Sequence, residues 1–185
     1  MSQRSLLVLF TATFALATVV TGCSSSQDRN ARGLFAVKVG ASGAGSNDPL
    51  SRLGAANTTI SAIEARRSDG TWVPVDGGFP AVVDLVALAK AGTTATLPGG
   101  LLPDGHYTAL HIHVVKGELT QLDGTHRVIA PAGAGWSVIV PVDFAVVTDR
   151  AMLVDLNVRL DQTFKLIEDS LEFEPEFEVT GVEHD

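Results

Sequence analysis

Two histidines, His111 and His113, stand two positions apart in residues 101–115, which read LLPDGHYTALHIHVV. The Pro-Asp-Gly turn near the start of this stretch predicts that a strand follows it. Alternate side chains of a strand share a face, so both imidazoles project from one side and the apolar residues beside them from the other. Two imidazoles presented by a rigid backbone can reach one ion, as they do in zinc and copper sites on sheets. The pair is therefore a candidate Zn²⁺ or Cu²⁺ site.

A metal site needs at least a third protein ligand. His126 is the first candidate, because an Asp-Gly hairpin at residues 123–124 brings it back beside the strand, in a register that places it opposite Gln121. His106, at the start of the strand, is the next candidate. The alternative is a pair of partly exposed histidines on the solvent face of a sheet, with no cofactor bound.

Four glutamates near the C-terminus alternate with other residues and so share one strand face: Glu172, Glu174, Glu176 and Glu178. Calcium binds several carboxylate oxygens, but neighbours on one strand face are about 7 Å apart, so one ion reaches no more than about two of them. We expect instead a charged edge that blocks pairing with another sheet and forms ion pairs across strands. The candidate partners are Arg159, Lys165 and Arg127.

The common signatures of enzymes do not occur in the sequence. It contains no G-x-S-x-G elbow, no S-x-x-K and no H-E-x-x-H motif. A Ser-His-Asp triad assembles only in space, so the sequence does not test for one. We expect a non-enzymatic binding or structural module. A second alternative is carbohydrate binding on an aromatic platform of Trp72, Trp136 and Tyr107, which are otherwise packing residues.

The N-terminal residues predict a lipoprotein. Arg4 precedes an uncharged apolar run over residues 6–20, which is too short for a comfortable membrane span. The run leads into Thr-Gly-Cys23, which resembles the lipobox of bacterial lipoproteins, where cleavage before the cysteine leaves an acylated first residue. The alternative is an ordinary secretory signal with an incidental cysteine. Ser24, in place of an aspartate, resembles the outer-membrane members of that class, so we expect an anchor in the outer membrane, facing the periplasm or the cell surface.

Composition limits the partners. The net charge is −8 and no basic stripe is present to neutralise phosphates, so a nucleic-acid partner is not expected. Hydrophobic residues make up 45% and charged residues 18% of the 185 positions, a balance typical of a folded core. Cys23 is the single cysteine, so no disulfide within the chain can stabilise that core. The expected partners are a membrane, through the lipid anchor, and an envelope protein or glycan.

We divide the chain into four parts. Residues 1–22 are the signal peptide, 23–32 a lipidated flexible tether, 33–180 the folded domain and 181–185 a C-terminal tail. Within the domain, residues 40–48 predict a Gly/Ser-rich surface loop rather than a phosphate cradle, because no Gly-Lys-Ser/Thr follows.

Short alternating segments predict that the domain consists of strands. Two Asp-Gly turns predict hairpins, one joining residues 58–67 to 72–75 and one joining 117–122 to 125–130. The spacing of Ile60 and Ile63 breaks strict alternation and predicts a β-bulge. Further strands are predicted at residues 34–39, 101–115, 137–144, 153–161 and 172–179.

Two local signals add detail. Residues 82–90 predict one or two helical turns, with Asp84 as the cap and Gly92 as the stop. Pro175 cannot donate to a ladder, so the last strand is predicted to lie at a sheet edge. Many short strands with little helix predict an all-β fold, an antiparallel two-sheet β-sandwich.

The order of several motifs resembles one uncharacterised family of bacterial and archaeal lipoproteins, the domain of unknown function forty-three eighty-two. The motifs are an apolar first strand, T-x-I-x-x-I at residues 58–63, D-L-V-A-L at 84–88, L-P-D-G-H-Y-T-A-L-H-I-H at 102–113 and a proline-bearing last strand. The resemblance covers residues 33–179. It implies a β-sandwich of the transthyretin-like or immunoglobulin-like kind and brings no established activity. The segment at residues 40–56 is longer and richer in glycine than the acidic turn usual in that family.

Overall fold

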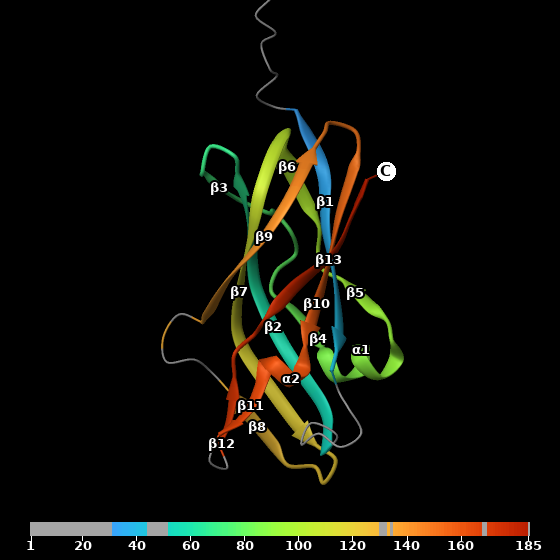
Figure 1. The fold of residues 1–185 in the computed structure, drawn as a ribbon, viewed down its shortest axis with the longest axis vertical. Helices are drawn as coiled ribbons and strands as arrows, with labels where there is room; N and C mark the ends of the chain where they lie inside the picture. Colours follow the sequence, from blue (N-terminus) through green and yellow to red (C-terminus); the bar gives the residue numbers. More distant parts are fainter. Residues whose placement is uncertain (1–30, 44–51, 130–132, 134, 168–169, 185) are drawn as a thin grey trace, which may run out of the picture.

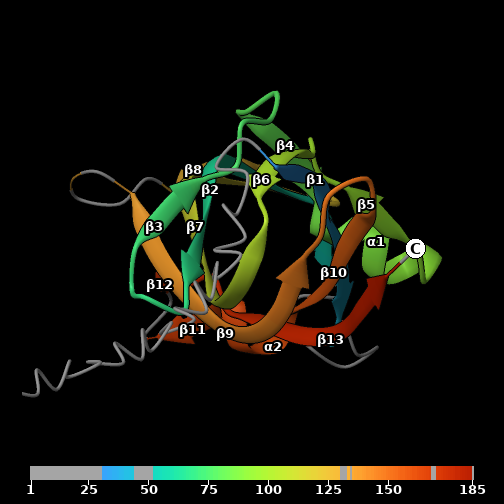
Figure 2. The ribbon, with the colours of Figure 1, turned by 90° about the horizontal axis from the view of Figure 1, so that it is seen from above.

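The structure, a computed structural model, describes residues 31–43, 52–129, 133, 135–167 and 170–184. In this part of the chain two sheets face each other across one core, which confirms the predicted all-β sandwich (Figures 1 and 2). Among these residues, no helix is both long and apolar enough to cross a bilayer. The signal peptide, Cys23 and most of the predicted Gly/Ser-rich loop lie outside the described residues.

The first sheet has five strands, which are β1 (Arg32–Ser42), β5 (Thr94–Thr96), β6 (Gly100–Pro103), β10 (Ala151–Arg159) and β13 (Phe177–His184). Its order is β13-β10-β1-β5, and β6 also pairs with β1. The central pair, β1 with β10, is parallel, whereas the other pairs are antiparallel. A parallel pair needs a long crossover connection, and here the whole of the second sheet lies between the two strands in sequence.

The second sheet has six strands, which are β2 (Leu53–Arg67), β3 (Trp72–Pro74), β4 (Ala81–Asp84), β7 (Gly105–Gln121), β8 (His126–Ile129) and β9 (Trp136–Val146). Its order is β3-β2-β7-β8, while β4 also pairs with β2 and β9 with β7. The long strand β7 therefore has β2 along one edge, and β9 and then β8 along the other. This central position gives its outward side chains neighbours on both sides.

Four short elements complete the described fold. A small two-stranded sheet pairs β11 (Phe164–Ile167) with β12 (Ser170–Phe173), after the single turn α2 (Leu160–Thr163). The helix α1 (Leu85–Ala91) follows β4 directly. The Asp84 side chain accepts hydrogen bonds from the amides of Val86 and Ala87, and Gly92 ends the helix with a left-handed φ of 61°, so the predicted cap and stop are confirmed.

The core forms where the inner faces of the two sheets meet. Phe144 on β9 stacks on Phe35 of β1 and on Tyr107 of β7, with ring centroids 5.2 Å apart in each pair. The alternation predicted along β7 and β10 is confirmed, because the inward residues of both strands are almost fully buried. These include Leu110, Ile112, Val114, Val154, Leu156 and Val158.

Both predicted Asp-Gly hairpins are present, and both loops have three residues rather than two. Arg67 bonds to Thr71 across the first loop and Gln121 to Thr125 across the second, with left-handed Gly70 and Gly124 as the third loop residues. The extra loop residue shifts the register by one, so His126 lies opposite Thr120 and the predicted partner, Gln121, is wrong. The bulge predicted near Ile60 is confirmed by register shifts on both sides of that residue.

The C-terminal part differs from the prediction in two ways. The predicted strand at residues 172–179 is interrupted around Pro175, so that β12 and β13 belong to different sheets. Beyond the interruption, β13 lies at a sheet edge and continues to His184. Gly181, Val182 and Glu183 pair with β10, so most of the predicted tail, residues 181–185, belongs to the domain. Antiparallel pairing with β10 fixes this segment in the sheet, which its polar composition does not reveal.

Candidate metal centre

The outward face of β7 brings His111 and His113 together with one carboxylate. In the register, His111 lies opposite Glu64 of β2, while His113 lies opposite Ser137 of β9. Opposite residues on one sheet face have Cβ atoms about 5 Å apart, and diagonal neighbours remain within reach of long side chains. The bulge around Ile60 sets which β2 residue meets His111. Strand pairing therefore places a glutamate beside both imidazoles.

One carboxylate oxygen contacts both rings. Glu64 Oε2 lies 3.0 Å from His111 Nδ1 and 3.1 Å from His113 Nε2. The two imidazole centroids are 3.9 Å apart. One ligand atom from each of the three residues lies within 4.8 Å of those of the other two. Because an ionised carboxylate only accepts, both ring nitrogens donate to it when no ion is bound.

The second nitrogen of His111 also has a partner. His111 Nε2 makes a short contact with Ser137 Oγ. The ring of Trp72 on β3 lies with its centroid 5.3 Å from that of His111, and the Arg66 guanidinium lies over the indole. These contacts hold the imidazole plane, so that His111 Nδ1 keeps facing Glu64.

The electrostatics favour a charged carboxylate. The hydrogen bond from His113 is the largest cause that lowers the pKa of Glu64 below its ordinary value of 4.5, and His111 lowers it further, against the opposing effect of burial. At neutral pH Glu64 is therefore a carboxylate. Its side chain is 31% exposed, against 17% for His111 and 35% for His113. The cluster is thus partly sheltered and still open to solvent.

This donor set suits a divalent transition metal. Zinc bonds of about 2.0–2.1 Å in tetrahedral geometry place two ligands about 3.3 Å apart, close to the separations of Glu64 from the two ring nitrogens. Two histidines with one glutamate form a set that leaves a fourth coordination position for water or another ligand. Solvent reaches the three side chains, so that position would face outward.

The two histidines predicted as third ligands lie elsewhere. His106 Nε2 lies 2.7 Å from Asp143 Oδ1, and His126 Nε2 lies 4.0 Å from Glu118 Oε1. Neither belongs to the cluster of Glu64, His111 and His113, so the structure brings neither of the predicted third ligands to the histidine pair. The signal that could have found Glu64 is its place as the single acidic residue of β2.

The other candidate features of the sequence do not form sites. The four glutamates are exposed as predicted, but they are divided between β12, β13 and the segment that joins them. Of their predicted partners, Arg159 pairs with Asp161 at 2.7 Å, and Lys165 lies opposite Glu172 in the backbone register. The row is a charged edge in the described part of the chain.

The three aromatic residues proposed for sugar binding lie in different surroundings. Tyr107 is fully buried and its hydroxyl donates to the Pro103 carbonyl at 2.7 Å. Trp136 packs edge to face on Phe173, with centroids 4.7 Å apart. Trp72 alone of the three lies beside the histidine cluster. They do not form a common platform.

Comparison with known protein families, with curated protein sequences and with solved structures found no match for this chain.

Proposed function

We propose that this protein is a lipid-anchored domain of the cell envelope that binds one divalent transition-metal ion, Zn²⁺ or Cu²⁺, through Glu64, His111 and His113. The observation that carries the proposal is the approach of one carboxylate oxygen to a nitrogen of each imidazole, at 3.0 and 3.1 Å. The set combines two neutral nitrogen donors with one anion, which matches the preferences of these ions.

Metal binding would replace protons that now lie between the three side chains. The ion would occupy the position of the Nδ1 proton of His111 and that of the Nε2 proton of His113, and the single N–H proton of each neutral ring would move to its other nitrogen. For His111 that nitrogen is Nε2, which faces Ser137 Oγ. The Nε2–H group would donate a hydrogen bond to this hydroxyl oxygen, which would fix the tautomer, as outer-shell partners of metal-bound histidines commonly do.

The cellular location is the second part of the proposal. Cys23 ends the apolar leader in a sequence that resembles the lipobox, and the resemblance to the uncharacterised lipoprotein family agrees with it. Acyl chains on Cys23 would hold the domain at a membrane surface. In that position the cluster would serve as an envelope site for metal binding, with the outward coordination position free for an exogenous ligand.

Calorimetry of the purified full chain in detergent, titrated with ZnCl₂ and with CuCl₂, tests the metal site. We expect one equivalent to bind to the wild type and no binding by His111→Ala/His113→Ala. Trp72 adds an optical readout, because Cu²⁺ bound beside His111 should quench its fluorescence. The matched control is His106→Ala/His126→Ala, which removes two histidines outside the cluster and should leave binding intact. Equal loss in both double variants, or no binding by the wild type, contradicts the proposal.

A second candidate function has one observation in its favour. Ser137, His111 and Glu64 are joined in the order hydroxyl, imidazole, carboxylate, which is the connectivity of a serine-hydrolase relay. In that case the Ser137 hydroxyl would attack an ester carbonyl and pass its proton to His111 Nε2. Ser137→Ala separates the two functions, since it would abolish ester hydrolysis but lower metal affinity by only about 10- to 100-fold, as expected for an outer-shell partner. Hydrolysis of a p-nitrophenyl ester by the metal-free wild type, absent in Ser137→Ala, would favour the hydrolase.

A further inference from the structure

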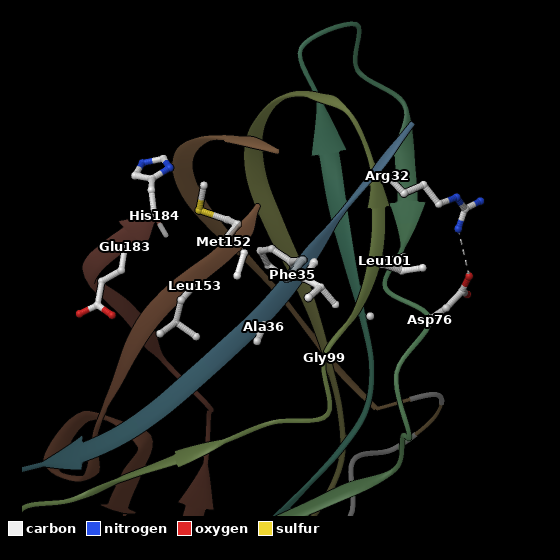
Figure 3. A pocket seen from close by; sticks show the side chains of 13 residues that line it. Arg32, Phe35, Ala36, Asp76, Gly99, Leu101, Met152, Leu153, Glu183 and His184 are labelled. Carbon is white, nitrogen blue, oxygen red and sulfur yellow. Dashed lines mark ion pairs between the residues drawn. The ribbon is translucent and has the colours of Figure 1, made fainter. Parts of the chain in front are cut away.

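The first sheet carries an apolar groove on its outer face (Figure 3). The metal cluster belongs to the outer face of the other sheet. The groove has a volume of about 670 Å³ and runs across β6, β1 and β10. Leu34 and Leu101, which are paired across β1 and β6, remain 60% and 44% exposed. Leu153 of β10 adds a third apolar side chain to the groove. Large side chains of this kind usually find a partner when they gather on one surface.

The apolar character is confined to one end of β1. Leu34 and Ala36 line the groove, but the next outward residue, Lys38, forms ion pairs with Glu183 at 3.5 Å and Asp155 at 3.9 Å. The outer face of the first sheet therefore changes from apolar to charged along β1. The apolar end is the end at which the described domain begins (Figure 1).

The residues around this end continue the pattern. Leu34 donates its amide to the carbonyl of Arg150, which places the turn between β9 and β10 beside the start of β1. That turn exposes Val147 and the Arg150 side chain. At the rim of the groove Arg32 lies 3.9 Å from Asp76. The rim thus combines Arg32 and Arg150 with acidic Asp76, Asp149 and Glu183, so it is the exposed apolar side chains that suit a lipid interface, where they would meet acyl chains.

The segment between Cys23 and the domain limits how far this surface can lie from the bilayer. Arg32 follows Cys23 by nine positions, and a fully extended chain of that length spans about 30 Å at most. An acyl group on Cys23 would therefore hold the groove within that distance of the membrane.

We propose that the groove between β6, β1 and β10 is a lipid-facing surface that docks on the acyl region of the bilayer in which Cys23 is anchored. The inference rests on the lipid-anchor part of the proposed function and is independent of the metal site. It orients the domain, because the metal cluster lies on the outer face of the other sheet and would be directed away from the docked surface. A protein partner in the same groove is the competing occupant, and the experiment below distinguishes the two.

Bromine atoms on lipid acyl chains quench a fluorophore only on contact, so they report which residues enter the bilayer. The full chain carrying Leu101→Cys is labelled with an environment-sensitive nitrobenzoxadiazole probe and reconstituted into phosphatidylcholine vesicles with and without brominated acyl chains. The matched control is Val82→Cys on β4 of the other sheet, because Val82 is an apolar residue that is 62% exposed. We expect loss of fluorescence in brominated vesicles for the probe at Leu101 and none for the probe at Val82.

Each outcome has a defined meaning. Failure of the wild type to float with vesicles, together with thiol labelling at Cys23, would contradict the lipid anchor and the docking surface with it. Flotation with equal fluorescence in brominated and ordinary vesicles would overturn the docking surface and leave the anchor standing. Shielding of the Leu101 probe from aqueous iodide in native membranes, without bromolipid quenching, would assign the groove to a protein partner and also overturn the proposal.

Discussion

The outer faces of the two sheets differ, although their inner faces are alike. Inside, both sheets present closely packed aliphatic and aromatic side chains to one shared core. Outside, the second sheet carries Glu64 with two histidines, whereas the first carries exposed Leu34 and Leu101. The inner faces must be similar because they bury each other.

The difference shows where this fold has freedom to acquire function. A strand alternates its side chains, so every outward position can change without disturbing the inward one beside it. His111 and His113 lie on either side of Ile112, which is completely buried. The same strand thus contributes to the core and to the proposed metal site, and the two roles are separable by mutation.

Both faces depend on the core between them, so the largest expected effect is the loss of stability when the aromatic ring of Phe144 is removed. Phe144 is 2% exposed and stacks on rings from both sheets. We expect Phe144→Ala to lower the free energy of unfolding by about 3–5 kcal/mol, measured by urea denaturation. Ile139→Ala, at an exposed site on the same strand, should change it by no more than about 0.5 kcal/mol. Equal effects of the two substitutions would contradict the shared core.

Removing the anionic ligand should weaken metal binding on one face and leave lipid contact on the other face unchanged. Glu64→Gln keeps the shape of the side chain but replaces one acceptor oxygen with an NH₂ donor and removes the negative charge. Loss of an outer-shell partner lowers metal affinity by about 10- to 100-fold, and we expect zinc affinity, measured by calorimetry, to fall by more than this. Bromolipid quenching of the probe at Leu101 should stay the same. Glu118→Gln on the neighbouring stretch of β7 is the control and should retain zinc affinity. A joint change in binding and quenching would show that the faces are coupled.

The smallest expected effect is a pH dependence of folding stability in the metal-free protein. Because folding lowers the pKa of Glu64 below 4.5, its carboxylate stabilises the folded state above that pH, and this contribution is lost as pH falls through the folded-state pKa. In the presence of a chelator, wild type should exceed Glu64→Gln in urea midpoint at pH 7, and the gap should narrow by pH 3. A gap that is independent of pH would show that the carboxylate charge does not stabilise the fold.

Local patterns predicted much of this architecture. The inward residues of β7, β9 and β10, the two hairpins, the bulge near Ile60 and the Asp84 cap all follow from short-range spacing. The common face of His111 and His113 follows from the same period of two. One register detail failed, since an Asp-Gly pair does not reveal whether two or three residues form the loop.

The amino-acid sequence by itself determined which side chains each strand turns inward and which outward, because that choice depends on alternation within the strand. The tertiary structure decided which outward residues become neighbours. Glu64 lies 47 positions before His111, and the bulges in β2 set the register that joins them. Likewise, the parallel pairing of β1 with β10 assembles the apolar groove from distant segments. Pairing between remote strands depends on bulges, loop lengths and packing summed over the whole sheet, and no single stretch of sequence contains that sum.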